Sequence, residues 1–102
     1  MAERRMPASS DGSVVLDIGG NIGALVVEMS GDWLGREPDL TPVGGTVAIM
    51  HTEVRERHVD GEIRYAAVYA SVPAGEYTIE DLASVFRVEG GKVTESRPLI
   101  DH

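Results

Sequence analysis

The sequence contains no cysteine, which excludes disulfide scaffolds, thiol catalysis and metal or iron–sulfur sites built on thiolates. It also has no apolar stretch that approaches the roughly 20 residues of a membrane-spanning helix. No apolar segment follows the arginines near the N-terminus, as a secretory signal would require. We therefore expect a cytoplasmic protein that does not associate with a membrane, and we predict no cofactor.

Positive charge is also scarce. Nine Lys and Arg residues face 17 Asp and Glu residues, which gives a formal net charge of −8. A sequence-independent nucleic-acid binder needs a positive face, and anionic membrane surfaces attract basic segments. We expect neither nucleic acid nor membrane as a partner, and the only basic cluster in the predicted folded body is Arg55, Arg57 and Arg64.

A sustained helical period is missing, and short β-branched and aromatic runs alternate with turns rich in Gly, Asp and Pro. This pattern predicts an all-β sandwich of about seven or eight mostly antiparallel strands. We place the domain at residues 13–97, after a disordered lead-in at 1–12 and before a frayed end at 98–102. Because the core of so short a chain is small, association would stabilise it, and we expect a homo-oligomer.

The longest predicted hairpin has the Asp-Gly pair 60–61 at its tip. Asp-Gly is a favoured two-residue loop of type I′. It predicts that residues 46–57 pair along their length with residues 62–72, so that Val54 lies opposite Ala67.

Proline and glycine give three further predictions. Pro38 lacks the N–H that a ladder needs, so the short strand near 36–41 is expected at a sheet edge. The segment "GGNIG" at 19–23 reads as a turn before a strand, not as a phosphate loop before a helix. The pair Gly90-Gly91 is expected to close a second hairpin.

The segment "VYASVPAGEYTIE" has an aromatic residue, an aliphatic residue and then the order Pro-x-Gly-x-Tyr-x-aliphatic. The residues are Tyr69, Val72, Pro73, Gly75, Tyr77 and Ile79. This pattern resembles the prealbumin-like (transthyretin-like) sandwiches, including the carboxypeptidase regulatory-domain type. The resemblance implies that Tyr69 and Tyr77 lie in the core, and strand alternation then puts Ala67 and Tyr65 on the same side.

Residues 14–27, 51–57 and 65–78 resemble a group of short actinobacterial proteins that are sometimes labelled phospholipases. The residues do not support that activity. No serine sits in Gly-x-Ser-x-Gly, and a chain without helices cannot build the α/β-hydrolase fold that uses this elbow. We therefore expect a protein that is not an enzyme.

The run "HTEVRERH" at 51–58 concentrates functional side chains. In a strand His51 and His58 would lie about 23 Å apart on opposite faces, so they cannot share a metal ion. His51 and Glu53 share a face about 7 Å apart and could both reach one ion, although a structural zinc site needs four ligands. Arg55 could contact a bound anion.

Three interpretations of this outward face stay open. It is a solvated strand face with cross-strand ion pairs, a subunit interface, or a metal or small-anion site. The interface interpretation rests on the apolar area of Ala66, Val68 and Ala70 beside the charges. Trp33, the only tryptophan, either covers the open end of the sandwich or anchors a partner.

We predict a non-enzymatic binding or assembly module that self-associates through an outward sheet face. The alternative is a metal- or small-ligand-binding protein that uses His51 and Glu53 with Arg55. The candidate ligand or interface residues are His51, Glu53, Arg55, Arg57 and Trp33, and the metal candidates among them are His51 and Glu53.

Overall fold

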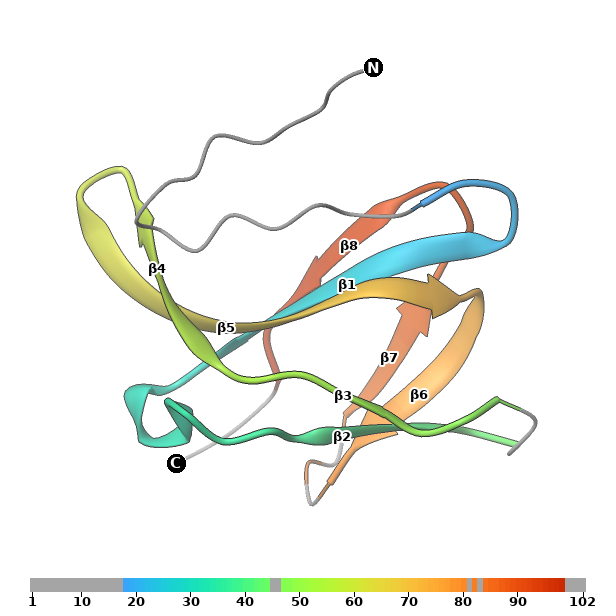
Figure 1. Cartoon of the computed structure of the whole chain (residues 1–102), viewed down its shortest axis with the longest axis horizontal. Coiled ribbons are helices and arrows are strands. Elements are labelled where there is room, and N and C mark those ends of the chain that lie inside the picture. Colours follow the sequence, from blue (N-terminus) through green and yellow to red (C-terminus); the bar gives the residue numbers. More distant parts are fainter. Residues whose placement is uncertain (1–17, 45–46, 81, 83, 99–102) are drawn as a thin grey trace.

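The computed structural model describes residues 18–44, 47–80, 82 and 84–98. These residues form eight strands in two four-stranded sheets that pack face to face, with one short 3-10 turn (Figure 1). The prediction of an all-β sandwich is confirmed. The described part of the chain has no helix long and apolar enough to cross a membrane. The predicted lead-in at 1–12 and most of the first predicted strand lie outside the described residues.

Sheet A has the strand order β4-β5-β1-β8, and sheet B has the order β3-β2-β6-β7. Sheet A consists of β4 (Arg55–Val59), β5 (Glu62–Pro73), β1 (Ile22–Met29) and β8 (Val93–Ser96). Sheet B consists of β3 (Met50–His51), β2 (Asp39–Pro42), β6 (Gly75–Ile79) and β7 (Val85–Val88), and the 3-10 turn η1 is Gly31–Trp33. Neighbouring strands are antiparallel except β1 and β8, which are parallel.

The core lies between the inner faces of the two sheets. Strand alternation sends every second side chain inward, and most of the buried residues follow that rule. The buried residues of this core are Leu25, Val27, Met29, Leu40, Val54, Ala67, Tyr69, Val72, Tyr77, Ile79, Phe86 and Val88. The expected burial of Tyr69, Tyr77 and Ala67 is confirmed, and Tyr65 is half-buried against the same cluster.

The two buried tyrosines each satisfy their hydroxyl group with a backbone carbonyl. Tyr69 donates to the carbonyl oxygen of Pro38 at 2.8 Å, and Tyr77 donates to that of Pro73 at 2.6 Å. Burial raises the pKa of both phenols. The Tyr77 bond spans four residues, as in the tyrosine corners of other sandwiches, and ties β6 to the end of β5.

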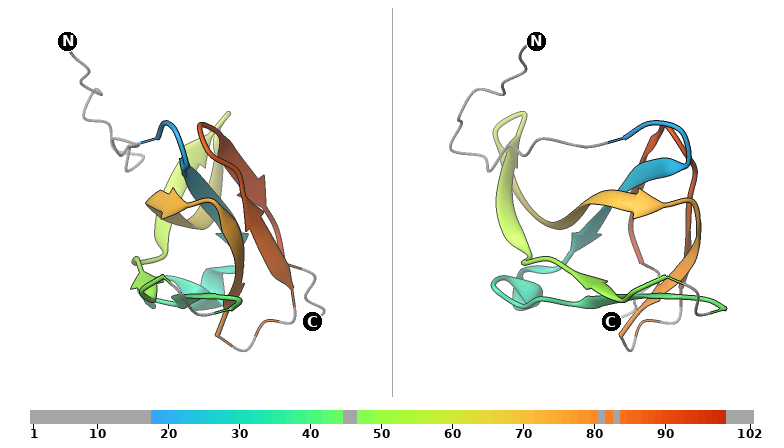
Figure 2. Two further views of the ribbon diagram at one scale, coloured as in Figure 1. Left: turned by 90° about the vertical axis from the view of Figure 1, so that its right-hand side faces the viewer. Right: turned by 45° about the vertical axis from the view of Figure 1, so that its right-hand side comes forward.

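The β4–β5 hairpin forms in the predicted register near its tip. Asp60 and Gly61 have φ values of 51° and 82°, which suits a type I′ turn. Pairing continues as far as Arg55 opposite Ala66. Because β5 is long and bends, the hairpin rises at one side of sheet A (Figures 1 and 2).

The prediction of a single strand at 46–57 is wrong, because the chain passes from sheet B to sheet A in the middle of this segment. His51 ends β3 in sheet B, and β4 begins in sheet A four residues later. Val54 does not pair with Ala67. Its N–H donates to the carbonyl oxygen of Arg36 at 2.8 Å, and its carbonyl accepts from Gly35 at 2.9 Å, while its side chain stays fully buried.

The edge position predicted for the strand near Pro38 is also wrong. Strand β2 begins at Asp39 and lies between β3 and β6. Pro38 precedes the ladder, so its missing N–H leaves no ladder position empty. Its carbonyl instead accepts the Tyr69 hydroxyl.

The turn at Gly90-Gly91 does not close a hairpin, because β7 and β8 belong to different sheets. It packs instead against the turn that precedes β1. The N–H of Gly91 donates to Ile22, and a Cβ at Gly90 would collide with the carbonyl oxygen of Gly20. Glycine is required here because two backbones meet without room for a side chain.

Candidate functional site

The structure does not keep the residues of "HTEVRERH" on one strand face. His51 lies in sheet B, opposite Asp39, whereas Arg55 and Arg57 lie in sheet A. Glu53 lies in the segment that crosses between the sheets. The four predicted site residues therefore divide between two surfaces of the sandwich.

The proposed metal ligands already have separate partners. His51 Nε2 lies 3.9 Å from Glu37 Oε1, and Glu53 Oε1 lies 3.5 Å from Arg55 Nη2. In the part of the chain that the structure describes, no group of three or more His, Asp or Glu residues could hold a metal ion. The geometry gives a metal at His51 and Glu53 no third ligand from these residues.

Trp33 ends the 3-10 turn and is half-buried against the core cluster. The guanidinium carbon of Arg36 lies 4.1 Å from the centroid of its ring, in cation–π contact. The ring is thus held from both sides, by the core and by a charged group.

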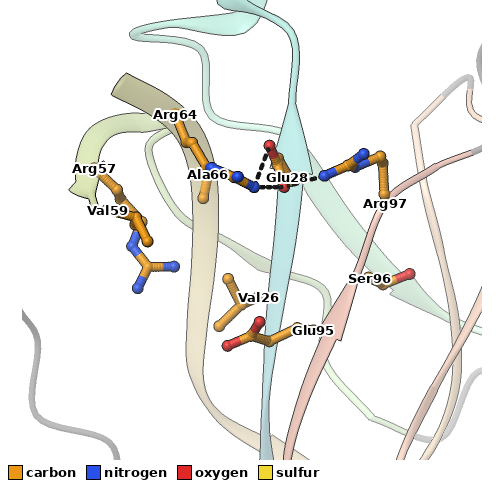
Figure 3. Close-up of a pocket in the computed structure, with 9 residues that line it drawn as sticks. All are labelled: Val26, Glu28, Arg57, Val59, Arg64, Ala66, Glu95, Ser96 and Arg97. Carbon is orange, nitrogen blue, oxygen red and sulfur yellow. Dashed lines mark hydrogen bonds and ion pairs between the residues drawn. The ribbon is translucent and has the colours of Figure 1, made fainter. Parts of the chain in front are cut away.

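A hollow of about 490 Å³ lies on the outer face of sheet A, between the β4–β5 hairpin and β8 (Figure 3). We call it the arginine hollow. Its apolar side chains are Val26, Val59 and Ala66, and its polar residues are Glu28, Arg57, Arg64, Glu95, Ser96 and Arg97. Val26 and Ala66 are buried although neither belongs to the core between the sheets. The bend of β5 raises the β4–β5 hairpin at one side of sheet A, and Arg57 and Val59 of this hairpin border the hollow (Figures 1 and 3).

Glu28 is the centre of a charge cluster at one end of the arginine hollow. Its Oε1 accepts from Arg97 at 2.8 Å, and its two oxygens accept from Arg64 Nη1 at 3.3 and 3.4 Å. The hydrogen bond from Arg97 lowers the pKa of Glu28, helped by the charges of both arginines and opposed by burial. Arg64 Nη2 also donates to Glu62 Oε1 at 3.0 Å, so two carboxylates balance the two guanidinium groups here.

Two donor groups of the arginine hollow have no acceptor among the described residues. The Arg57 guanidinium enters the hollow and makes no hydrogen bond or ion pair with any of them (Figure 3). The Nε of Arg64 is buried and equally without an acceptor there. Glu95 faces Arg57 across Val26, and it too lacks an ion pair within the described chain.

The outer face of sheet B carries aliphatic and threonine side chains where the arginine hollow carries charged ones. We call it the aliphatic face and define it by Thr41, Val43, Ile49, Thr78 and Val85. Thr41 pairs with Thr78, and Thr78 pairs with Val85. The register of β2 with β3 brings Ile49 beside Thr41, and the N–H of Val43 continues the ladder to Glu76. Thr41, Thr78 and Val85 thus lie on β2, β6 and β7, whereas Ile49 directly precedes β3 and Val43 directly follows β2.

The charges around the aliphatic face are paired. Glu76 lies 3.1 Å from Arg87, and Glu80 lies 3.7 Å from Arg36. His51 lies beside Glu37 on the same side. Acidic groups at this rim thus have basic neighbours, in contrast to the acidic balance of the whole chain.

Sequence reasoning identified Arg57 and Arg64 but missed Glu28, Glu95 and Arg97. The only signal for Glu28 was a lone charge in the apolar run "ALVVEM", at an outward position. No local pattern could show that it meets Arg97, which lies 69 residues further along the chain.

No family model, no curated protein and no solved structure matches this chain. The functional interpretation therefore rests on the geometry of the arginine hollow and the aliphatic face.

Proposed function

We propose that the protein is a non-enzymatic binding and assembly module that self-associates through the aliphatic face of sheet B. One observation carries the proposal. Ile49 and Val85 are each 57% exposed and Val43 is 55% exposed, which makes them the most exposed large hydrophobic residues of the described chain. Strand alternation directs all three toward this face, and exposed apolar side chains that gather on one face mark interaction surfaces.

A second copy of the chain is the partner that the charges favour. Two molecules with a net charge of −8 repel each other unless the contact surface is locally balanced. Two carboxylates at the rim of the aliphatic face are balanced in this way, because Glu76 pairs with Arg87 and Glu80 pairs with Arg36. A two-fold contact places the same patch on both sides, so an apolar centre meets an apolar centre.

The test replaces one aliphatic side chain with a charged one. We expect the wild-type protein to sediment as an oligomer and Val85→Lys or Ile49→Lys to sediment as a monomer, because a buried unpaired charge opposes the contact. Ile63→Lys is the matched control, because Ile63 is 53% exposed but lies near the tip of the β4–β5 hairpin. A monomeric wild type, or dissociation by Ile63→Lys alone, contradicts the proposal.

A ligand-binding role is the second candidate, and the arginine hollow is the surface that supports it. The alternative centred on His51 and Glu53 has less support, because each already pairs with a different neighbour. Loss of a bound metal in His51→Ala, with the oligomer intact, would restore that alternative.

We also infer that the sandwich is prealbumin-like. The support is the burial of Tyr69, Val72, Tyr77 and Ile79, the aromatic and aliphatic positions of the motif. The Pro73 carbonyl closes the turn by accepting the Tyr77 hydroxyl. An experimental structure superposed on prealbumin-like sandwiches checks this inference.

A further inference from the structure

The arginine hollow has the dimensions of a small-molecule site. Its volume of about 490 Å³ falls within the range of roughly 300–1,000 Å³ that is usual for ligand pockets. Its residues come from all four strands of sheet A and, for Arg97, from the segment that follows β8, so strands of one sheet position most of them. Val26 and Ala66 supply apolar surface between the charged walls (Figure 3).

The basic groups of the hollow are not all paired with carboxylates. Three arginines and two glutamates line it, in a protein of net charge −8. Arg64 pairs with Glu28 and with Glu62, which lies outside the lining, and Arg97 pairs with Glu28. Arg57 has no carboxylate partner among the described residues. An unpaired cationic group in a recess attracts anions, because the recess focuses the field.

The unmatched donors indicate what kind of anion fits. A guanidinium has five N–H donors in a planar fork, and that fork matches the two oxygens of a carboxylate. Arg57 has no acceptor among the described residues, and the buried Nε of Arg64 has none there either. A buried donor without an acceptor is unusual in proteins, and a bound group often explains one.

Glu95 limits the charge of the ligand. Its carboxylate lies across Val26 from the Arg57 guanidinium (Figure 3). A second negative group on the ligand would be directed toward Glu95 and repelled by it, whereas an aliphatic body would rest on Val26 and Ala66. We propose that the arginine hollow binds a small organic monocarboxylate, with its carboxylate on Arg57 and its aliphatic part on Val26 and Ala66.

The proposal is independent of self-association, because the hollow and the aliphatic face lie on opposite outer faces of the sandwich. The test is a titration of the full-length ¹⁵N-labelled protein with sodium butyrate at constant ionic strength, followed by the arginine Nε–Hε signals. We expect saturable shifts at Arg57 and Arg64. Succinate and inorganic phosphate, titrated in the same way, should bind more weakly than butyrate.

Arg57→Met should weaken butyrate binding about tenfold or more, since a charge-assisted hydrogen bond to the carboxylate is lost. Arg55→Met is the matched control, because Arg55 lies two residues away on the same strand but outside the hollow. It should leave the affinity unchanged. Glu95→Gln should strengthen butyrate binding by a few fold and succinate binding by more, because the carboxylate that repels anions is removed.

Three outcomes overturn the proposal. The first is the absence of saturable shifts with butyrate. The second is an equal loss in Arg55→Met and Arg57→Met, which would show non-specific attraction to surface arginines. The third is tighter binding of phosphate or succinate than of butyrate, which would assign the hollow to a different class of anion.

Discussion

On both outer faces of the sandwich, strand alternation directs every second side chain away from the core. The two faces nevertheless differ in how far such side chains are exposed. Val26 points outward from sheet A and is 7% exposed, whereas Val85 points outward from sheet B and is 57% exposed. Val26 lies on β1, between β5 and β8, whereas Val85 lies on the edge strand β7. Alternation determines which side chains leave the core, and the curvature and neighbours of the strand determine what then covers them.

The largest effect we expect is on stability. Val26→Ala and Val85→Ala remove the same methyl groups and the same β-propensity. Val26→Ala should lower the free energy of unfolding by about 2 kcal/mol, because buried methyls are lost. Val85→Ala should stay within about 0.5 kcal/mol.

Urea denaturation of the two variants measures this difference. It should be done in the monomeric Ile49→Lys background, so that association does not add to the stability of either variant. Equal losses in the two alanine variants would show that the outer face of sheet A is as open as that of sheet B.

A smaller difference in unfolding free energy is expected between the loss of the Glu28 ion pairs on sheet A and the loss of the Glu76–Arg87 ion pair on sheet B. Glu28→Gln should cost about 1 kcal/mol of unfolding free energy, because Arg97 loses its carboxylate partner and Arg64 keeps only Glu62. Glu76→Gln removes a single exposed pair with Arg87 and should cost less than about 0.5 kcal/mol. Thermal unfolding at low and high salt measures both, and the Glu28 effect should persist better in salt. A larger cost for Glu76→Gln would contradict the comparison.

The pH dependence of stability should show the Glu28 cluster directly. The pKa of Glu28 is lowered in the folded protein, chiefly by Arg97, so its carboxylate stabilises the fold above the ordinary glutamate pKa of 4.5. That contribution should be lost as the pH falls through the lowered native pKa. Unfolding free energies measured from neutral to acid pH should therefore decline less in Glu28→Gln than in the wild type. Identical declines would mean that the arginines do not hold this carboxylate.

Local rules in the sequence predicted much of the fold. The Asp-Gly turn determined the register of β4 with β5, and the Tyr69 and Tyr77 motif identified the inward faces. These predictions depend on residues that lie close together in the chain. They succeed because a two-residue loop and a period of two leave little freedom.

The surfaces could not be predicted in the same way. The change of sheet after His51 depends on Val54 finding backbone partners at Gly35 and Arg36, in a loop that no periodicity describes. The arginine hollow depends on Glu28 meeting residues 36 and 69 positions away. Such contacts follow from the packing of the two sheets and leave no mark in any short window of sequence.

We propose that the two outer faces have different tasks, with self-association assigned to the aliphatic face. A dilution series of ¹H–¹⁵N correlation spectra of the wild-type protein would locate the surface of self-association. We expect the concentration-dependent shifts at Val43, Ile49 and Val85 and their strand neighbours. Shifts that gather instead at β4 and β8, or no shifts at any concentration, would contradict it.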